Sequence, residues 1–515
     1  MDREKDRVNV THDSLPDPDT GLSEEERQRL NKALMRKLDW NLVPWVSLLY
    51  LISFLDRANI GNAKIYGLEK DLHMTDLQYN IGLTLFFIPY SIIEPLTNLA
   101  LKRMRPKLFL SLIMVTWAIC LTCMGFIHNF AGLCAARFFL GLTEAGLFPG
   151  VNYYLSCWYR RKELGIRAAV FFSAAAFAGS FGGLLAAAIA EMDGIGGKPG
   201  WAWIFIVEGL ATLAVGVATY WMVADFPHKA TFLSPDERSR VLYRLQQDKQ
   251  SSASHEKTQN AHVKQALTDW KTYFYMAIYG GCAGSLYAFS LFLPTIIKEL
   301  GIVHTATHAN LLSVPSYTAA VVMTIVIGWY ADKSQKRGMC NLAMSVLAMV
   351  GFIMMLASNK PGVKYAGTYL IALGIYPTIP NTITWVSNNT EGVSKRGIVL
   401  GMVIGWGNLN GIVSSNIYRS QDAPRFILGH SVMIAYLAVF LFGGSLATTL
   451  LLRIENRRRR KGLRNRLVEN KTEAEIEILG DKVYVLPRQS MSGLKLTSLG
   501  PTLFTPLDGL EMAGR

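Results

Sequence analysis

The sequence predicts an all-α membrane protein whose twelve transmembrane helices form two six-helix bundles. Half of its 515 residues are apolar and only 17% are charged, which is too apolar for a soluble protein of this length. A helix needs roughly 20 apolar residues to cross the hydrocarbon layer of a bilayer, and twelve stretches of that kind occur along the chain. A polar stretch in the middle of the chain separates the first six from the last six.

The predicted spans alternate with shorter polar loops. The first six are 41–63, 79–101, 108–128, 130–155, 166–190 and 201–224, and the last six are 271–297, 309–331, 341–358, 365–387, 397–417 and 430–452. They divide the chain into an N-terminal tail (1–40), a first bundle (41–224), a linker (225–270), a second bundle (271–452) and a C-terminal tail (453–515). Two halves joined by a linker are typical of transporters built from repeats, whose substrate site lies at mid-membrane between the halves.

The distribution of basic residues predicts the orientation. Lys and Arg gather in the loops at 102–107, 160–162 and 333–337, whereas the alternate loops carry few. The positive-inside rule therefore places both termini and the linker in the cytoplasm. The net charge of +14 does not predict a nucleic-acid partner, because it is divided among short clusters and forms no contiguous basic face. All six cysteines lie in or next to apolar spans, so we expect neither disulfides nor a metal site.

Four ionisable residues interrupt the predicted spans. Asp56 and Arg57 lie in the first span, and Arg137 and Glu144 lie in the fourth. A charge at the bilayer centre costs at least about 2.5 kcal/mol, so each of them calls for a partner or a function. Arg137 and Glu144 are seven residues apart, so they share a helix face but stand roughly 10 Å apart along the axis. We therefore expect their partners to come from the first span.

The four charges predict a proton-dependent anion site. The paired N–H donors of a guanidinium group match a carboxylate, so Arg57 and Arg137 are the candidate substrate-binding residues. A desolvated carboxyl group resists ionisation, so Asp56 and Glu144 are the candidate proton-coupling residues. When both carboxyls are ionised the four charges cancel, and when both are protonated the arginines are free to bind an anion. The alternative is a buried ion-pair network that only fixes helix packing.

A second group of residues predicts a gating loop at the cytoplasmic end of the eighth span. Gly328 and Asp332 are followed there by the basic residues Lys333 and Arg337. An acid beside basic residues at a helix end is able to latch neighbouring helices and to release them when the helices rock. Ordinary anchoring of the span at the membrane surface is the alternative.

Small and helix-breaking residues mark close contacts in the second half. Glycines recur in the fifth and eleventh spans and indicate close helix packing. The eleventh span also carries Asn408 and Asn410, and Pro377 and Pro380 interrupt the tenth. Either asparagine is a candidate for lining the cavity, and packing between helices is the alternative for both.

These motifs resemble the major facilitator superfamily and, within it, the fungal allantoate-permease-like branch of the anion:cation symporter family. The segment 56–63 is similar to the first-helix signature of that branch, and the segment 137–150 is similar to its fourth-helix pattern. The segment 328–338 resembles the loop motif of the superfamily, and 422–430 resembles a later loop of the family. The resemblance covers about residues 37–466.

The resemblance implies a role for each matching residue. Arg57 and Arg137 would contact the anion, and Asp56 and Glu144 would carry the proton. Asn408 would be a substrate contact from the second half. Members of the family carry carboxylates such as allantoate, nicotinate, pantothenate or biotin, so a small carboxylate is the implied substrate class.

Together these observations predict a monomeric, proton-coupled importer of a small organic anion in the plasma membrane. No enzymatic activity, cofactor or metal is expected, and no nucleotide-binding motif is present to supply energy from ATP. Two alternatives stay open. One is an exporter of an acidic secondary metabolite, because the gradients set the direction of transport, and the other is a nutrient sensor on a transporter scaffold.

Overall fold

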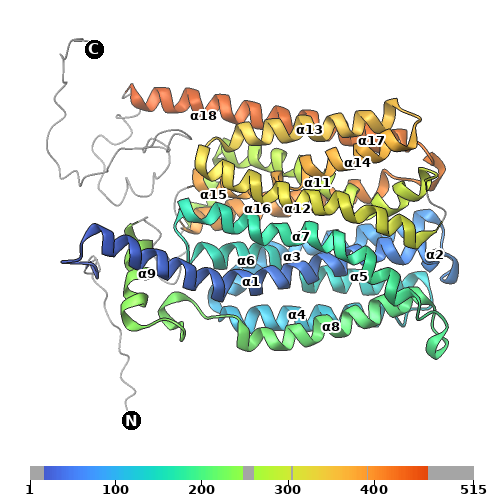
Figure 1. Ribbon diagram of the computed structural model, residues 1–515, viewed down its shortest axis with the longest axis horizontal. Coiled ribbons are helices and arrows are strands. Elements are labelled where there is room, and N and C mark those ends of the chain that lie inside the picture. The colour runs from blue at the N-terminus through green and yellow to red at the C-terminus, as the bar shows by residue number, and fades with distance from the viewer. Residues whose placement is uncertain (1–16, 248–259, 303–304, 391–392, 462–515) are drawn as a thin grey trace.

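The computed structural model describes residues 17–247, 260–302, 305–390 and 393–461. These residues form long helices that run roughly parallel to one axis, as Figure 1 shows. No strand occurs in the described ranges. The predicted all-α architecture is therefore confirmed.

The helices follow the predicted order. The first half contains α1 (Glu24–Ile65), α2 (Leu68–Asp71), α3 (Asp76–Arg103), α4 (Pro106–Met124), α5 (Phe130–Glu144), α6 (Leu147–Ser156), α7 (Arg161–Ala190) and α8 (Gly200–Met222). The linker contains α9 (Pro235–Gln247) and α10 (Asn260–Thr268). The second half contains α11 (Trp270–Glu299), α12 (Ala306–Ser334), α13 (Arg337–Ala357), α14 (Pro361–Ile375), α15 (Thr378–Asn389), α16 (Val393–Asn416), α17 (Ile427–Ala435), the π-helix η4 (Tyr436–Gly443) and α18 (Gly444–Arg460).

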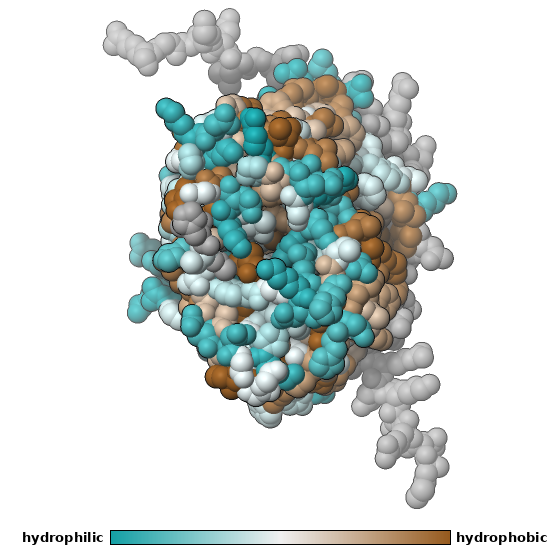
Figure 2. Space-filling view, turned by 90° about the vertical axis from the view of Figure 1, so that its right-hand side faces the viewer, coloured by the Kyte–Doolittle hydropathy of each residue, from teal (hydrophilic) through white to brown (hydrophobic). Residues whose placement is uncertain are grey.

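Ten helical stretches in the described part of the chain are long and apolar enough to cross a membrane. The other two predicted spans, the second and the tenth, correspond to α3 and to the pair α14 and α15. Large apolar side chains are exposed along the outer helices, which is expected of a surface that faces lipid; they include Trp40, Leu112, Trp221, Val322 and Val439. In Figure 2, the end of the bundle opposite α9 carries hydrophilic side chains across its middle and hydrophobic ones at its margins.

Two predicted spans are broken near their middle for the same reason. The fourth span is divided into α5 and α6 at Ala145 and Gly146, and the tenth into α14 and α15 at Tyr376 and Pro377. A proline lies four residues after the start of each break, at positions 149 and 380. Proline has no N–H to donate to the carbonyl four residues earlier and its ring clashes with that carbonyl. Spans four and ten hold the same position in their halves, and such paired interruptions point to the binding site of a repeat-built transporter.

The two halves meet along two helix pairs, α7 with α12 and α3 with α16. Glycines allow the close approach that the sequence predicted. A Cβ atom on Gly179 of α7 would lie 2.6 Å from the ring of Tyr317 on α12. A Cβ atom on Gly411 of α16 would lie 2.3 Å from the ring of Phe87 on α3. A larger residue at either position would therefore push the halves apart.

The linker helix α9 packs against the first half at the end of the bundle where α1 begins (Figure 1). Lys37 of α1 lies 2.7 Å from the Glu237 carboxylate of α9, and Arg240 of α9 lies 2.6 Å from Asp19. Arg244 of α9 also pairs with Glu163 at the start of α7. Residues 248–259 of the predicted linker lie outside the described residues.

Candidate functional site

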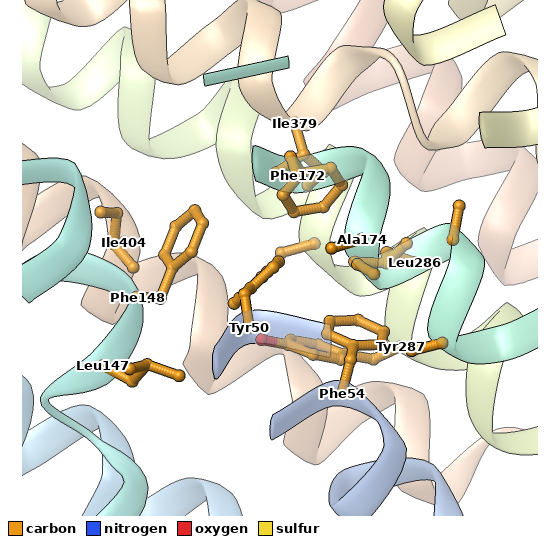
Figure 3. Close-up of a cluster of buried hydrophobic side chains, with 14 of the residues drawn as sticks. Tyr50, Phe54, Leu147, Phe148, Phe172, Ala174, Leu286, Tyr287, Ile379 and Ile404 are labelled. Atoms are coloured by element: carbon orange, nitrogen blue, oxygen red, sulfur yellow. The ribbon is translucent and has the colours of Figure 1, made fainter. Parts of the chain in front are cut away.

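A narrow cavity lies between the two halves, and it holds about 10 Å³, close to the space of a single water molecule. Aromatic side chains form most of its wall, and Figure 3 shows several of them converging with aliphatic neighbours from both halves. The lining residues are Tyr50, Phe54, Arg57, Tyr90, Phe148, Phe172, Tyr279, Ala283, Leu286, Tyr287, Ile379 and Asn408. The cavity is therefore a closed aromatic compartment with one positive charge in its wall.

Arg57 supplies that charge from the middle of α1, and it is only 6% exposed. Its Nη2 donates a hydrogen bond of 2.6 Å to Oε1 of Glu144, and its Nη1 donates one of 3.2 Å to the Tyr287 hydroxyl. The guanidinium carbon also lies within 5.7 Å of four ring centroids, two of which belong to Phe86 and Tyr90. Contacts of this kind stabilise a desolvated cation.

Glu144 is the anionic partner of Arg57, and it is fully buried at the last position of α5. Its Oε1 accepts hydrogen bonds from Arg57 and from the Ser53 hydroxyl, each of 2.6 Å. Its Oε2 has no hydrogen-bond partner among the described residues. The expectation that the first span provides the partner of Glu144 is confirmed, and the helix break after Glu144 places this carboxylate where the backbone ladder is interrupted.

Arg137 lies close to Arg57 but does not line the cavity. It is 1% exposed, and none of its three side-chain nitrogens has a hydrogen-bond partner among the described residues. Its guanidinium carbon lies 4.7 Å from the centroid of the Phe86 ring, and that of Arg57 lies 5.2 Å from the same centroid. The ring of Phe86 therefore contacts both guanidinium groups. A buried cation without a hydrogen-bonded partner is costly, so Arg137 is a strong attractor for an anion.

Asp56 does not pair with either arginine, so the first span does not supply Arg137 with the anionic partner that was expected from it. Its Oδ2 accepts hydrogen bonds of 3.0 Å from the Trp117 indole on α4 and the Thr212 hydroxyl on α8. Adjacent residues in a helix point about 100° apart. Arg57 faces the second half, so Asp56 faces the interior of its own bundle.

The second half contributes Asn408, whose predicted place at the cavity matches the structure. The Tyr287 hydroxyl donates a hydrogen bond of 2.5 Å to Oδ1 of Asn408, and Nδ2 of Asn408 donates one of 2.7 Å to Oε2 of Glu94 on α3. Asn410 instead donates to the Trp406 carbonyl of its own helix. Asn408 is thus a cavity residue, whereas Asn410 is not among the lining residues.

Two buried carboxyl groups escaped the sequence analysis. Glu94 of α3 is 0% exposed and Glu208 of α8 is 4% exposed. Oε2 of Glu208 accepts a hydrogen bond of 2.6 Å from Asn59. Both glutamates lie inside predicted spans, at 79–101 and 201–224, so the rule that identified the other four charges also applies to them.

The predicted gating loop forms a compact contact between the halves at the end where α9 lies. Asp332 and Arg337 form an ion pair, and Arg337 also donates a hydrogen bond of 3.2 Å to Asn381 of α15. A Cβ atom on Gly165 of α7 would lie 2.1 Å from the Asp332 carboxylate. The first half therefore packs directly against this ion pair.

The remaining loop residues also contact their surroundings. Lys333 lies over the Trp329 ring, and a Cβ atom on Gly328 would lie 2.4 Å from Ala169 of α7. At the opposite end, the Ser420 hydroxyl of the second half donates a hydrogen bond of 2.8 Å to Asp76 of the first half. Contacts between the halves thus lie on both sides of the cavity.

Helices in two bundles, an enclosed cavity between them and a buried arginine in its wall are the architecture of a membrane transporter. The chain belongs to the Major Facilitator Superfamily, whose family model matches residues 46–415. An uncharacterized transporter of Schizosaccharomyces pombe is 37% identical over 82% of this chain and 83% of that one. The high-affinity nicotinic acid transporter of Saccharomyces cerevisiae is 32% identical over 80% of this chain and 76% of that one.

Solved structures agree with the fold. A bacterial homologue of the human lysosomal transporter Spinster, in an inward-facing and unoccupied conformation, superposes with a TM-score of 0.56 over 80% of this chain and 94% of that one. Its sequence identity is 14%, so the likeness concerns the fold alone. The predicted fold of twelve transmembrane helices in two bundles is confirmed.

Proposed function

We propose that this chain is a proton-coupled carrier of a small organic anion with one carboxylate and a flat, apolar body. The observation that carries the proposal is the buried Arg57 guanidinium in the wall of the cavity between the halves, with Glu144 as its anionic partner. A carboxylate substrate offers the same two oxygen acceptors as Glu144, so the two compete for one cation.

Competition of this kind couples the anion to a proton. When Glu144 is ionised it occupies Arg57, and the cavity has little attraction for an anion. When Glu144 takes up a proton it no longer holds the guanidinium group as an ion pair, and the substrate carboxylate replaces it. Arg137, whose guanidinium carbon lies 4.7 Å from the Phe86 ring centroid, adds positive potential. Asp56 bonds Trp117 and Thr212 inside the first half and does not face the cavity. Its proton-coupling role therefore stays a prediction.

The cavity has room for about one water molecule as it stands, so it must widen to admit a substrate, and the rings of its wall favour an aromatic one. Seven of the twelve lining residues are Phe or Tyr, and aromatic rings pack favourably against one another in stacked or edge-on arrangements. Polar groups are confined to Arg57, Asn408 and the tyrosine hydroxyls, so a substrate rich in hydroxyl groups would leave many of them without partners. A relative that carries the name nicotinic acid transporter fits this chemistry. We also propose that the protein imports its substrate across the plasma membrane and that it belongs to the allantoate-permease-like branch.

Uptake into proteoliposomes tests the proposal. Purified full-length protein is reconstituted, an acid-outside pH gradient is imposed, and labelled nicotinate is compared with labelled allantoate, which carries a carboxylate but no aromatic ring. We expect gradient-driven uptake of nicotinate that exceeds uptake by protein-free liposomes, which report passive entry of the neutral acid. Glu144→Gln should weaken the dependence on the gradient, because Glu144 no longer exchanges a proton. Uptake that equals the protein-free control for both anions would refute the proposal.

A further inference from the structure

Glu94 stands at the seam between the two halves and has a neutral partner. It is 0% exposed on α3, its Oε2 accepts a hydrogen bond from Asn408 of α16, and its Oε1 has no hydrogen-bond partner among the described residues. The titratable groups that face it are Tyr90 on its own helix, Arg57 on α1, and Tyr279 and Tyr287 on α11. A buried carboxylate with one neutral donor is poorly stabilised, so Glu94 is suited to exchange a proton during the transport cycle.

A chain of hydrogen bonds connects Glu94 to the cation in the cavity. Arg57 donates to the Tyr287 hydroxyl, Tyr287 donates to Asn408, and Asn408 donates to Glu94, over 3.2, 2.5 and 2.7 Å. Every donor in the chain points from the cation toward the carboxyl group. Hydrogen bonds in such a series polarise one another, so the charge on Glu94 responds to what occupies Arg57.

The charges of the site balance when Glu94 is included. Arg57 and Arg137 supply two positive charges, and Glu144 and Glu94 supply two negative charges when both are ionised. A substrate anion that binds beside Asn408 adds a negative charge close to Glu94. Two carboxylates about 6 Å apart in a protein interior repel each other enough to weaken binding about a hundredfold at an effective dielectric near 20. A proton on Glu94 removes that repulsion.

We infer that Glu94, which the sequence analysis did not select, is the second proton-binding carboxyl of the carrier, and that two protons therefore enter with each monocarboxylate. One proton binds Glu144 and releases Arg57. The other binds Glu94 and removes its repulsion of the substrate anion. Both protons leave when the halves open on the other side of the membrane. The loaded site then carries one more positive charge than the empty site. This inference rests on the proposed anion transport.

The other two buried acids, Asp56 and Glu208, are weaker candidates for the second proton site because their partners come from their own half. Asp56 is held by Trp117 and Thr212, and Glu208 is held by Asn59, all from the first half. Rocking of the halves leaves those surroundings unchanged, whereas it separates Glu94 from Asn408. Glu208 is also a matched control, because an asparagine donates to one of its oxygens over 2.6 Å and its other oxygen has no partner among the described residues.

The sensitivity of uptake to membrane potential tests the inference. Nicotinate uptake by proteoliposomes is measured at a fixed pH gradient, with and without an inside-negative potassium diffusion potential. Wild-type protein and Glu208→Gln should be accelerated by the potential, because each cycle moves one net positive charge. Glu94→Gln carries one proton fewer, so its uptake should be insensitive to the potential. A wild-type protein that ignores the potential, or a Glu94→Gln variant that keeps the wild-type response, would overturn the inference.

A measurement without substrate separates this inference from the proposed function. Infrared difference spectra of the reconstituted full-length protein are recorded while the pH is changed, and the carbonyl stretch of protonated carboxyl groups is followed. We expect Glu94→Gln to lose one titrating band that Glu208→Gln retains, and spectra identical to wild type would contradict the assignment even if Glu94→Gln transports nothing. If the wild type moves no carboxylate while the band is lost, anion transport fails and the proton site of Glu94 stands.

Discussion

Replacing Arg57 with lysine tests whether the guanidinium geometry, and not the charge alone, binds the anion. Lysine keeps the positive charge but has a single nitrogen, so it replaces one of the two donors that Arg57 directs at Glu144 and Tyr287. It also loses the planar group that lies against the rings of Phe54, Phe86 and Tyr90. One hydrogen bond to a charged group contributes about 1.5–3 kcal/mol, which corresponds to an increase of about 10- to 150-fold in the KM for the anion.

The assay is initial nicotinate uptake into proteoliposomes over a range of concentrations, with the amount of reconstituted protein measured in parallel. Arg240→Lys is the matched control, because Arg240 is also a buried arginine in an ion pair, 2.6 Å from Asp19, but lies in the linker helix. We expect its KM to equal that of the wild type. An Arg57→Lys variant with the wild-type KM would show that the Arg57–Glu144 pair only fixes helix packing and that the guanidinium group does not bind the anion.

Three further changes probe other parts of the account. Tyr287→Phe removes the hydroxyl between Arg57 and Asn408 and should raise the KM for nicotinate about tenfold, the effect of one lost hydrogen bond; an unchanged KM would remove the hydrogen-bond chain from the mechanism. Gly165→Ala adds a methyl group 2.1 Å from the Asp332 carboxylate, so the Asp332–Arg337 ion pair must shift. We expect slower uptake at an unchanged protein level. A wild-type rate would show that this contact does not gate transport. Glu237→Ala breaks a partly exposed ion pair with α1 and should lower the free energy of unfolding by about 1 kcal/mol or less. Thermal unfolding in detergent measures this change, and we expect uptake to be unchanged. A loss of uptake would show that the linker helix takes part in transport.

The fold was accessible from the sequence because lipid imposes a simple rule on length and apolarity. The predicted first span, 41–63, began at the edge of the apolar stretch, yet α1 starts at Glu24 because its polar first part packs against α9 through Lys37. Hydropathy records only the part of a helix inside the bilayer. The break after Glu144 was not predicted either, although the proline at position 149 carries a direct signal for it.

The site was predicted in part, since Arg57, Glu144 and Asn408 lie together at the cavity. Asp56 and Arg57 were assigned to one site because both interrupt the first span, but adjacent helical residues face different directions. Glu94 lies late in its predicted span and is followed by a proline. A charged residue in that position is easily interpreted as the end of a transmembrane helix. Its location opposite Asn408 depends on how α3 packs against α16, and no pattern in a single sequence specifies that packing.

The aromatic wall of the cavity was also beyond the sequence analysis. Phe and Tyr are spread over nearly all spans, and only the packing selects the seven that line the cavity. Tyr50 of α1 and Phe172 of α7 are separated by more than a hundred residues in the chain, yet their ring centroids lie 5.6 Å apart. Contacts between distant helices are fixed by tertiary packing, which periodicity does not report.

A structure of the carrier with nicotinate bound would show where the anion binds. We expect the nicotinate carboxylate to lie within hydrogen-bond distance of the Arg57 guanidinium, its ring to lie among Tyr50, Phe148 and Phe172, and Glu144 to have separated from Arg57. Nicotinate bound outside this cavity, with the Arg57–Glu144 pair intact, would show that Arg57 does not bind the anion.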